Sequence, residues 1–237
     1  IWAGEAYPRH TVELPGFFID QCEVTVARWQ RYITETGSTP LPHETTRHFG
    51  NPDAQQLPAG AITWSNACAY AAWAGKALPG EAQWEKAARG TDGRLFPWGN
   101  TPPTPKHGHF GGKLYTNVGS FPAGASPYGC LDMLGNQYEW TADRKTLYAN
   151  NPLVATDPHG AQIISWANGI DVVARGGSWY HGTSGFYAAK RFGLAPNETY
   201  YHIGFRTIWM PPPGYFDSPE YTKALKAAQA LAPPVAE

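Results

Sequence analysis

The segment RGGSWYHGTSGFYAAKR, residues 175–191, gathers the residue types in this chain that are best suited to chemistry. Two glycines allow a sharp turn, and Ser178 and His181 follow at a spacing of three residues. Histidine beside a hydroxyl group is typical of general acid–base catalysis, because the pKa of imidazole lies near neutrality. The segment holds no cysteine and no carboxylate. It predicts the lining of a pocket for proton transfer; the alternative is an aromatic core with a hydrogen-bonded histidine.

Histidines elsewhere in the chain carry weaker signals. His107 and His109 lie two residues apart in KHGH, and histidine is a ligand that suits zinc and copper. Two imidazoles do not make a metal site, and no cysteine, aspartate or glutamate flanks them, so we interpret the segment as a solvated loop. The same interpretation applies to the isolated residues His43, His48 and His159.

Three arginines recur beside the aromatic segments, namely Arg175, Arg191 and Arg206. One hypothesis is that they pair with buried carboxylates and hold the fold together. The other is that their planar guanidinium groups bind an anionic substrate.

Length and composition narrow the class of protein. The chain has 237 residues, a formal net charge of −1 and 16% charged residues, so it lacks the basic character of a nucleic-acid-binding protein. No apolar run approaches the roughly 20 residues of a membrane span. Its 26 glycines, 22 prolines and 10 tryptophans predict many turns and few long helices.

The cysteines and the first residue bear on the cellular compartment. Cys22, Cys68 and Cys130 lie far apart, which allows one internal disulfide or three free thiols. The chain starts at Ile1 instead of methionine, so we expect an upstream segment that has been removed or is disordered, in which any export signal would lie.

Capping and periodicity signals predict the elements that must position the 175–191 segment. Thr25, Ser65 and Ser218 are expected to cap helices. The helices are expected at 26–36, 63–75, 78–90 and 218–232. Strands are expected at 10–20, 171–179 and 202–210, with loops at 38–60 and 91–127.

Five blocks occur in an order that resembles a known family. They are VELPGFFIDQCEVT, ITWSNACAYAAWAGKALPGEAQWEKAARGTDGRLFPWGN, SPYGCLDMLGNQYEW, VARGGSW and IGFR. Together they resemble the formylglycine-generating-enzyme family, also called the sulfatase-modifying-factor family, over residues 5–206. The resemblance implies an α+β fold: a single compact, loop-rich domain with a C-type-lectin-like core at 1–210. Residues 211–237 would form a proline-led C-terminal tail with a short helix.

The resemblance also implies a change of chemistry. Copper-dependent members of the family carry one cysteine two residues after the aromatic of RGGSW and another five residues later; here these positions are His181 and Phe186. Cu(I) prefers sulfur ligands, which an imidazole and a phenyl ring do not supply. We therefore expect no copper–thiolate site and no conversion of cysteine to formylglycine.

A calcium site is the metal site that the resemblance implies. In the family, the loop matching DMLGNQYEW binds calcium; carried over, Asp132 and Glu139 supply carboxylates, and Gly135 and Gln137 supply backbone carbonyls. Calcium binds six to eight oxygen ligands, and we expect a structural role for it. The alternative is that Asp132 caps a turn and Glu139 forms a buried ion pair. A second family calcium site, at about 105–118, is expected to be lost or altered because few carboxylates occur there.

The family's catalytic groove maps onto two of the blocks. Ser178 matches a serine of that groove, Tyr138 stands where relatives usually carry tryptophan, and His181 replaces the first active cysteine. We expect these three residues to be catalytic. The expected substrate-binding residues are Trp140, Trp179, Tyr180, Phe186, Tyr187 and Arg191.

Three functions remain open after this comparison. The chain resembles members of the family that lack both cysteines and act in the periplasm in pyoverdine siderophore maturation, where a chromophore is oxidised. The alternatives are a lectin-like ligand- or protein-binding module and a non-catalytic, regulatory paralogue. For the enzyme we expect a periplasmic or secreted monomer, a small aromatic or peptide-borne substrate, and no nucleic-acid partner. No G-x-G-x-x-G fingerprint is present, so the redox cofactor and electron acceptor stay open.

Overall fold

A four-stranded sheet forms the centre of the computed structural model, which describes residues 6, 8–38, 52–148, 171–183 and 185–231. The strand order is β4-β3-β2-β5. Strand β2 is antiparallel to β3 and parallel to β5, and β3 is antiparallel to β4. The strands are β2 (Tyr138–Arg144), β3 (Val172–Arg175), β4 (Phe192–Leu194) and β5 (Ile203–Gly204).

A second sheet of two short strands joins an early segment of the chain to a late one. Strand β1 (Phe18–Ile19) is antiparallel to β6 (Ile208–Trp209), with Phe18 opposite Trp209. Only these two residues of the strand expected at 10–20 are paired. The strand expected at 202–210 is divided into β5 and β6, because the chain leaves the first sheet after Gly204 and joins the second at Ile208.

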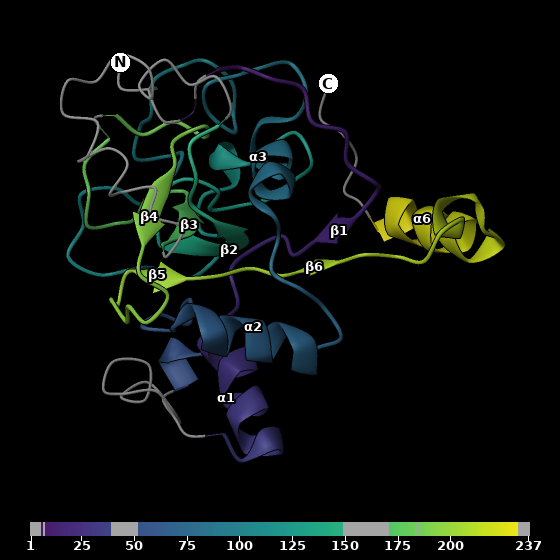
Figure 1. The fold of residues 1–237 in the computed structure, drawn as a ribbon, viewed down its shortest axis with the longest axis horizontal. Coiled ribbons are helices and arrows are strands. Elements are labelled where there is room, and N and C mark those ends of the chain that lie inside the picture. The colour runs from purple at the N-terminus through teal and green to yellow at the C-terminus, as the bar shows by residue number, and fades with distance from the viewer. Residues whose placement is uncertain (1–5, 7, 39–51, 149–170, 184, 232–237) are drawn as a thin grey trace.

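Three helices cover the four-stranded sheet. Figure 1 shows α1 (Val26–Thr36) and α2 (Trp64–Trp73) on one side of it and α3 (Glu81–Arg89) on the other. Thr25 caps α1 as predicted, and Gly37 ends it with a φ of 65°. The cap predicted at Ser65 is wrong: Oγ1 of Thr63 accepts the hydrogen bond from the backbone N–H of Asn66, because Thr63 is the last extended residue before the helix.

The main core lies between the sheet and the first two helices. Trp29 of α1, Tyr70 of α2 and Phe205 meet in stacked and edge-to-face contacts, with ring centroids 5.3–6.1 Å apart. A second buried cluster forms around Trp84 of α3 and Met133. Short 3-10 turns occur at Pro52–Ala54, Pro122–Gly124 and Tyr215–Asp217. The fold is therefore the expected loop-rich mixture of helix and sheet.

The C-terminal segment contains helix α6 (Pro219–Leu231), which extends away from the rest of the molecule (Figure 1). Oγ of Ser218 accepts a hydrogen bond from the N–H of Tyr221, as expected for its N-cap. None of the helices in the described ranges has both the length and the apolar character that a membrane span requires. The division into a domain at 1–210 and a tail at 211–237 stays a prediction.

Candidate functional site

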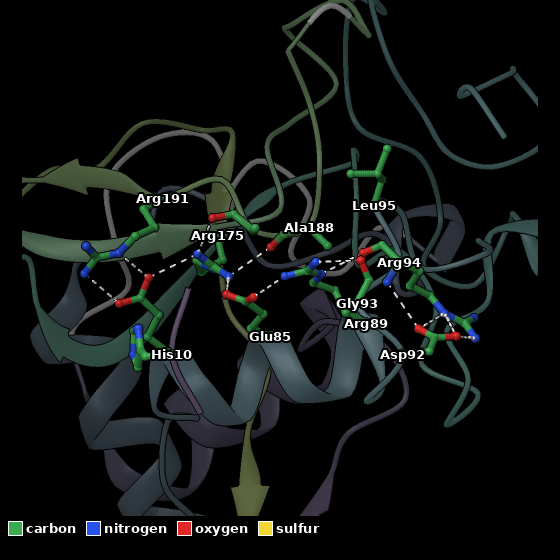
Figure 2. A network of polar contacts seen from close by, with 12 residues as sticks. His10, Glu85, Arg89, Asp92, Gly93, Arg94, Leu95, Arg175, Ala188 and Arg191 are labelled. Carbon is green, nitrogen blue, oxygen red and sulfur yellow. Dashed lines mark hydrogen bonds and ion pairs between the residues drawn. The ribbon is translucent and has the colours of Figure 1, made fainter. Parts of the chain in front are cut away.

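A chain of buried ion pairs holds strand β3 against helix α3 directly before the glycine turn. The guanidinium group of Arg175 is fully buried and donates to Glu81 at 3.1 Å and to Glu85 at 2.5 Å (Figure 2). It also donates to the carbonyl oxygens of Ala188 and Ala189. Because Arg175 joins α3 to the segment around residue 188, it fixes both ends of the 175–191 segment.

The two glycines after Arg175 then turn the chain sharply. Gly176 and Gly177 have φ values of 89° and 72°, which other residues rarely adopt. A Cβ atom on Gly177 would lie 1.7 Å from Cε1 of Phe186, so only glycine lets that ring pack here. The turn thus places Ser178 and the residues after it beside Phe186.

His181 lies at the centre of the cluster that this turn creates. Its Nδ1 atom is 3.1 Å from Oγ of Ser178, and the ring is half-buried. The rings of Tyr138, Tyr180 and Phe186 surround it at centroid distances of 5.5, 5.3 and 5.8 Å. The structure therefore brings the three predicted catalytic residues together. We call His181, Ser178, Tyr138, Tyr180 and Phe186 the histidine cluster.

Charge and burial favour the neutral form of His181. Partial burial lowers its pKa below the usual value, and the nearby ammonium group of Lys190 lowers it further. That ammonium group lies over the rings of Phe186 and Phe192, at 5.4 and 4.8 Å from their centroids. A neutral imidazole accepts a proton at neutral pH, as a general base must. Burial likewise raises the pKa of Tyr138, so its phenol stays protonated.

The predicted substrate-binding residues divide into two groups. Tyr180 is 60% exposed, Tyr187 is half-buried, and the buried Trp179 stacks on Tyr201 at 5.5 Å, so these rings lie at or just beneath the surface. Trp140 and Phe186 are instead buried. Nε1 of Trp140 donates to the carbonyl oxygen of Ile62 in the core, and the ring of Phe186 packs against His181.

Arg191 also points away from the histidine cluster. Its guanidinium group donates to both carboxylate oxygens of Glu81, at 2.6 and 2.8 Å (Figure 2). It also lies over the ring of Tyr148. Arg206 pairs with Glu139 in the core. All three arginines therefore make buried ion pairs, as the structural hypothesis predicted.

Sequence reasoning missed one residue of the site, His202. Its ring lies parallel to those of Tyr180 and Tyr200, at centroid distances of 5.9 and 5.3 Å, and its centroid is 6.2 Å from that of His181. Its Nδ1 atom is buried and has no hydrogen-bond partner among the described residues. Burial and, to a smaller degree, His181 lower its pKa to about 4. The tyrosines directly before it were the available signal.

This lowered pKa predicts how stability depends on pH. An unfolded histidine titrates near 6.5, so between about pH 6.5 and 4 the unfolded chain binds a proton that folded His202 does not. The folded state should therefore lose stability as the pH falls through this range. His202→Gln should show a smaller decrease in Tm between pH 7 and 4.5 than the wild type, whereas replacement of the exposed His10 should not. Equal decreases in wild type and His202→Gln would contradict the assignment.

The loop expected to bind calcium contributes to a buried acidic group. Glu139 already accepts two hydrogen bonds from Arg206 and one from Trp84. Oδ2 of Asp132 accepts a hydrogen bond from the N–H of Gly119, but Oδ1 of Asp132 has no hydrogen-bond donor among the described residues. The same is true of Oε2 of Glu23, a neighbouring and fully buried residue. Burial raises the pKa of Glu23, and the nearby carboxylate of Asp132 raises it further. No pattern in the sequence pointed to Glu23.

The other two predicted calcium ligands lie in the same loop. Gly135 has a φ of 86°, and the side-chain nitrogen of Gln137 donates to the carbonyl oxygen of Tyr201. Within the described ranges, no three histidine, cysteine, aspartate or glutamate side chains are grouped to bind a metal. Among the described residues, Asp132 and Glu23 thus each have one carboxylate oxygen that accepts no hydrogen bond from a backbone or amide N–H and is suited to a hard cation, while Glu139 is engaged by Arg206.

The remaining histidines and the cysteines lie apart from the cluster. His107 stacks on Trp98 at 4.4 Å, and Nε2 of His109 lies 2.6 Å from the carbonyl oxygen of Leu114, so the two imidazoles have separate partners. His43, His48 and His159 lie outside the described residues. All three cysteines are free.

Sequence comparison identifies relatives over most of the chain. The model of the sulfatase-modifying factor enzyme 1-like domain matches residues 3–211. Hercynine oxygenase of Mycolicibacterium smegmatis is 31% identical over 204 residues, covering 73% of this chain and 48% of that protein. The formylglycine-generating enzyme of Mus musculus is 30% identical over 261 residues, covering 86% of this chain and 68% of that protein. The chain spans about half the length of the hercynine oxygenases it matches.

Structural comparison gives the same fold. The structure of PvdO from Pseudomonas aeruginosa matches with a TM-score of 0.61 at 23% identity, over 81% of this chain and 79% of that one. The predicted C-type-lectin-like α+β architecture is confirmed. On the match over residues 3–211, the chain belongs to the sulfatase-modifying factor enzyme 1-like family, which it shares with the formylglycine-generating enzymes.

Proposed function

We propose that this chain oxidises a flat, electron-rich aromatic ring, free or carried on a peptide, without cysteine-bound copper. The hydrogen bond between His181 and Ser178 inside the histidine cluster carries the proposal. Relatives named as oxygenases support an oxidative reaction in the family. Because positions 181 and 186 hold an imidazole and a phenyl ring, and Cys22, Cys68 and Cys130 lie in other blocks, the residues present do not fit a copper–thiolate centre.

The proposed step is a two-electron dehydrogenation. The ring substrate loses two electrons and two protons; dioxygen receives both and becomes hydrogen peroxide. Nε2 of neutral His181 takes the first proton, while Ser178 holds the other ring nitrogen and so orients the imidazole. Tyr180, which is 60% exposed, supplies a flat apolar face for the substrate ring, while the buried ring of Phe186 packs against His181.

An oxidation assay tests this proposal directly. Catechol-type compounds, free or attached to short peptides, are incubated with the protein, and oxygen consumption and hydrogen peroxide are measured together. The proposal predicts equal amounts of each above the background of the buffer alone. A sulfatase-motif peptide with Cu(I) serves as the second substrate and should not be converted. Formation of formylglycine in that peptide would contradict the proposal.

Within this class of reaction, we propose maturation of a siderophore chromophore of the pyoverdine type, outside the cytosol. Support comes from the missing cysteine pair and from the segment beyond residue 210. Neighbouring genes for a peptide synthetase and an export signal in the full-length gene are the expected observations. A full-length gene without an export signal would contradict the location.

Ligand binding without turnover is the second candidate function. The exposed rings of Tyr180, Tyr200 and Tyr201 would suit such a binding face. Saturable binding of aromatic compounds with no oxygen uptake would decide in its favour.

We also propose that calcium stabilises the loop at 132–139, with Asp132 and Glu23 supplying the free carboxylate oxygens. A bound ion stabilises the folded chain by RT ln(1 + [L]/Kd), about 2.7 kcal/mol at a hundredfold excess over Kd. Wild-type Tm should therefore rise with calcium and fall with chelator. Asp132→Ala should abolish that difference, and replacement of the exposed Asp217 should keep it. A wild-type Tm that is the same with calcium and with chelator would rule out the site.

A further inference from the structure

A cavity of about 480 Å³ lies outside the histidine cluster, beside strand β1. The apolar side chains of segment 12–19 line it, together with Ala87 of α3, Tyr128 and Cys130. Binding sites for small molecules usually measure roughly 300–1,000 Å³ and are mostly apolar. Size and lining therefore match those of a small-molecule site. We call it the β1 cavity.

The charged side chain that lines the β1 cavity, among the described residues, is positive. No aspartate or glutamate is among the described residues that line it, and Lys86 is the one charged side chain there. In the described part of the chain, the ammonium group of Lys86 forms no ion pair. The ammonium group of Lys76, by contrast, pairs with Asp20. The cavity thus combines an apolar interior with one unpaired positive charge.

The C-terminal segment packs on two residues that line this cavity, Gly16 and Phe18. The ring of Phe216 packs so closely on Gly16 that a Cβ there would lie 2.2 Å from Cε2 of the ring. Phe216 also stacks on Phe18 at 5.6 Å, and Phe18 lies 5.5 Å from Trp209. Phe18 and Phe216 are 39% and 37% exposed, so apolar surface continues from the cavity onto the outside of the molecule.

We infer that the β1 cavity binds a small amphiphilic carboxylate, with its alkyl or aryl body among the apolar side chains and its carboxylate beside Lys86. Burial of the apolar body supplies the affinity. The single ammonium group, with no competing acid in the lining, selects an anion over a cation of the same shape.

Dodecanoate is the probe, and dodecyltrimethylammonium, with the same chain and the opposite charge, is its control. Both are titrated below their critical micelle concentrations, and heat is recorded by isothermal titration calorimetry. Wild-type protein should bind one dodecanoate at least fivefold more tightly than the cation. Equal affinities would overturn the inference, as would no binding of dodecanoate.

Three variants locate the site. Lys86→Gln should weaken dodecanoate binding about fivefold, the loss expected for a partly exposed ion pair, and remove the preference over the cation. Leu14→Asp places a carboxylate in the wall, outside any helix or strand, and should abolish dodecanoate binding with little change in Tm. Lys106→Gln, an exposed lysine elsewhere, should bind as the wild type does. Wild-type affinity in both Lys86→Gln and Leu14→Asp would overturn the inference. None of these measurements requires turnover, so they stand apart from the proposed oxidation.

Discussion

Replacing His181 by alanine should lower the rate of substrate oxidation about 100-fold or more while leaving KM nearly unchanged, as expected for loss of a general base. The ring occupies the middle of the histidine cluster, and Nδ1 is held by Ser178 at 3.1 Å. The remaining rings still bind the substrate, but the imidazole that Ser178 holds in place to take its proton is gone. Added imidazole should restore part of the rate.

Two further variants separate this role from simple packing. Phe186→Ala should instead raise KM, because the buried ring packs against His181 and its loss leaves the substrate-binding cluster less well packed. His107→Ala changes a histidine that stacks on Trp98 outside the cluster and should keep the wild-type rate.

In the wild type, the rate should fall on acidification at a pH below 6.5, since burial and Lys190 lower the pKa of His181. Full activity in His181→Ala would show that the ring only packs.

Arg206→Ala should cause the largest loss of stability, about 3–5 kcal/mol, because it leaves the buried carboxylate of Glu139 without a positively charged partner. The guanidinium group is fully buried and donates to Glu139 at 2.6 and 2.7 Å. It also donates to the carbonyl oxygens of Asp20, Gln21 and Leu131, and so joins three segments of the chain. A loss of that size is a large part of the 5–15 kcal/mol typical of a domain.

Urea unfolding followed by tryptophan fluorescence measures this effect. The matched control is Arg31→Ala, which breaks an i,i+4 pair with Glu35 whose side chains are 72% and 44% exposed. Exposed pairs of this kind contribute about 0.3–0.5 kcal/mol. Similar losses in the two variants would contradict the structural role assigned to Arg206.

Local signals in the sequence predicted the helices well. Thr25 and Gly37 define α1, and Gly90 ends α3, because capping depends on the residues next to the helix end. The strand predictions were less accurate, since pairing depends on distant segments. Residues 202–210 have a continuous strand pattern, yet the chain changes sheets between Gly204 and Ile208.

The residues of the site that lie close together in the sequence were predicted, and the residue that lies far from them in the sequence was missed. Ser178 and His181 are three residues apart, so the turn after Arg175 brings them together. His202 reaches His181 only because β5 runs parallel to β2, with Ile203 opposite Tyr138. The close contact of Glu23 with the loop at 132–139 likewise joins residues more than a hundred positions apart, which no local pattern reports.

A crystal structure with a bound catechol-type substrate tests the central claim most directly. The substrate ring should lie against Tyr180, with a proton-bearing atom about 2.6–3.2 Å from Nε2 of His181, within hydrogen-bond reach. A substrate bound elsewhere, for example in the β1 cavity, with Nε2 of His181 touching no part of it, would contradict the account.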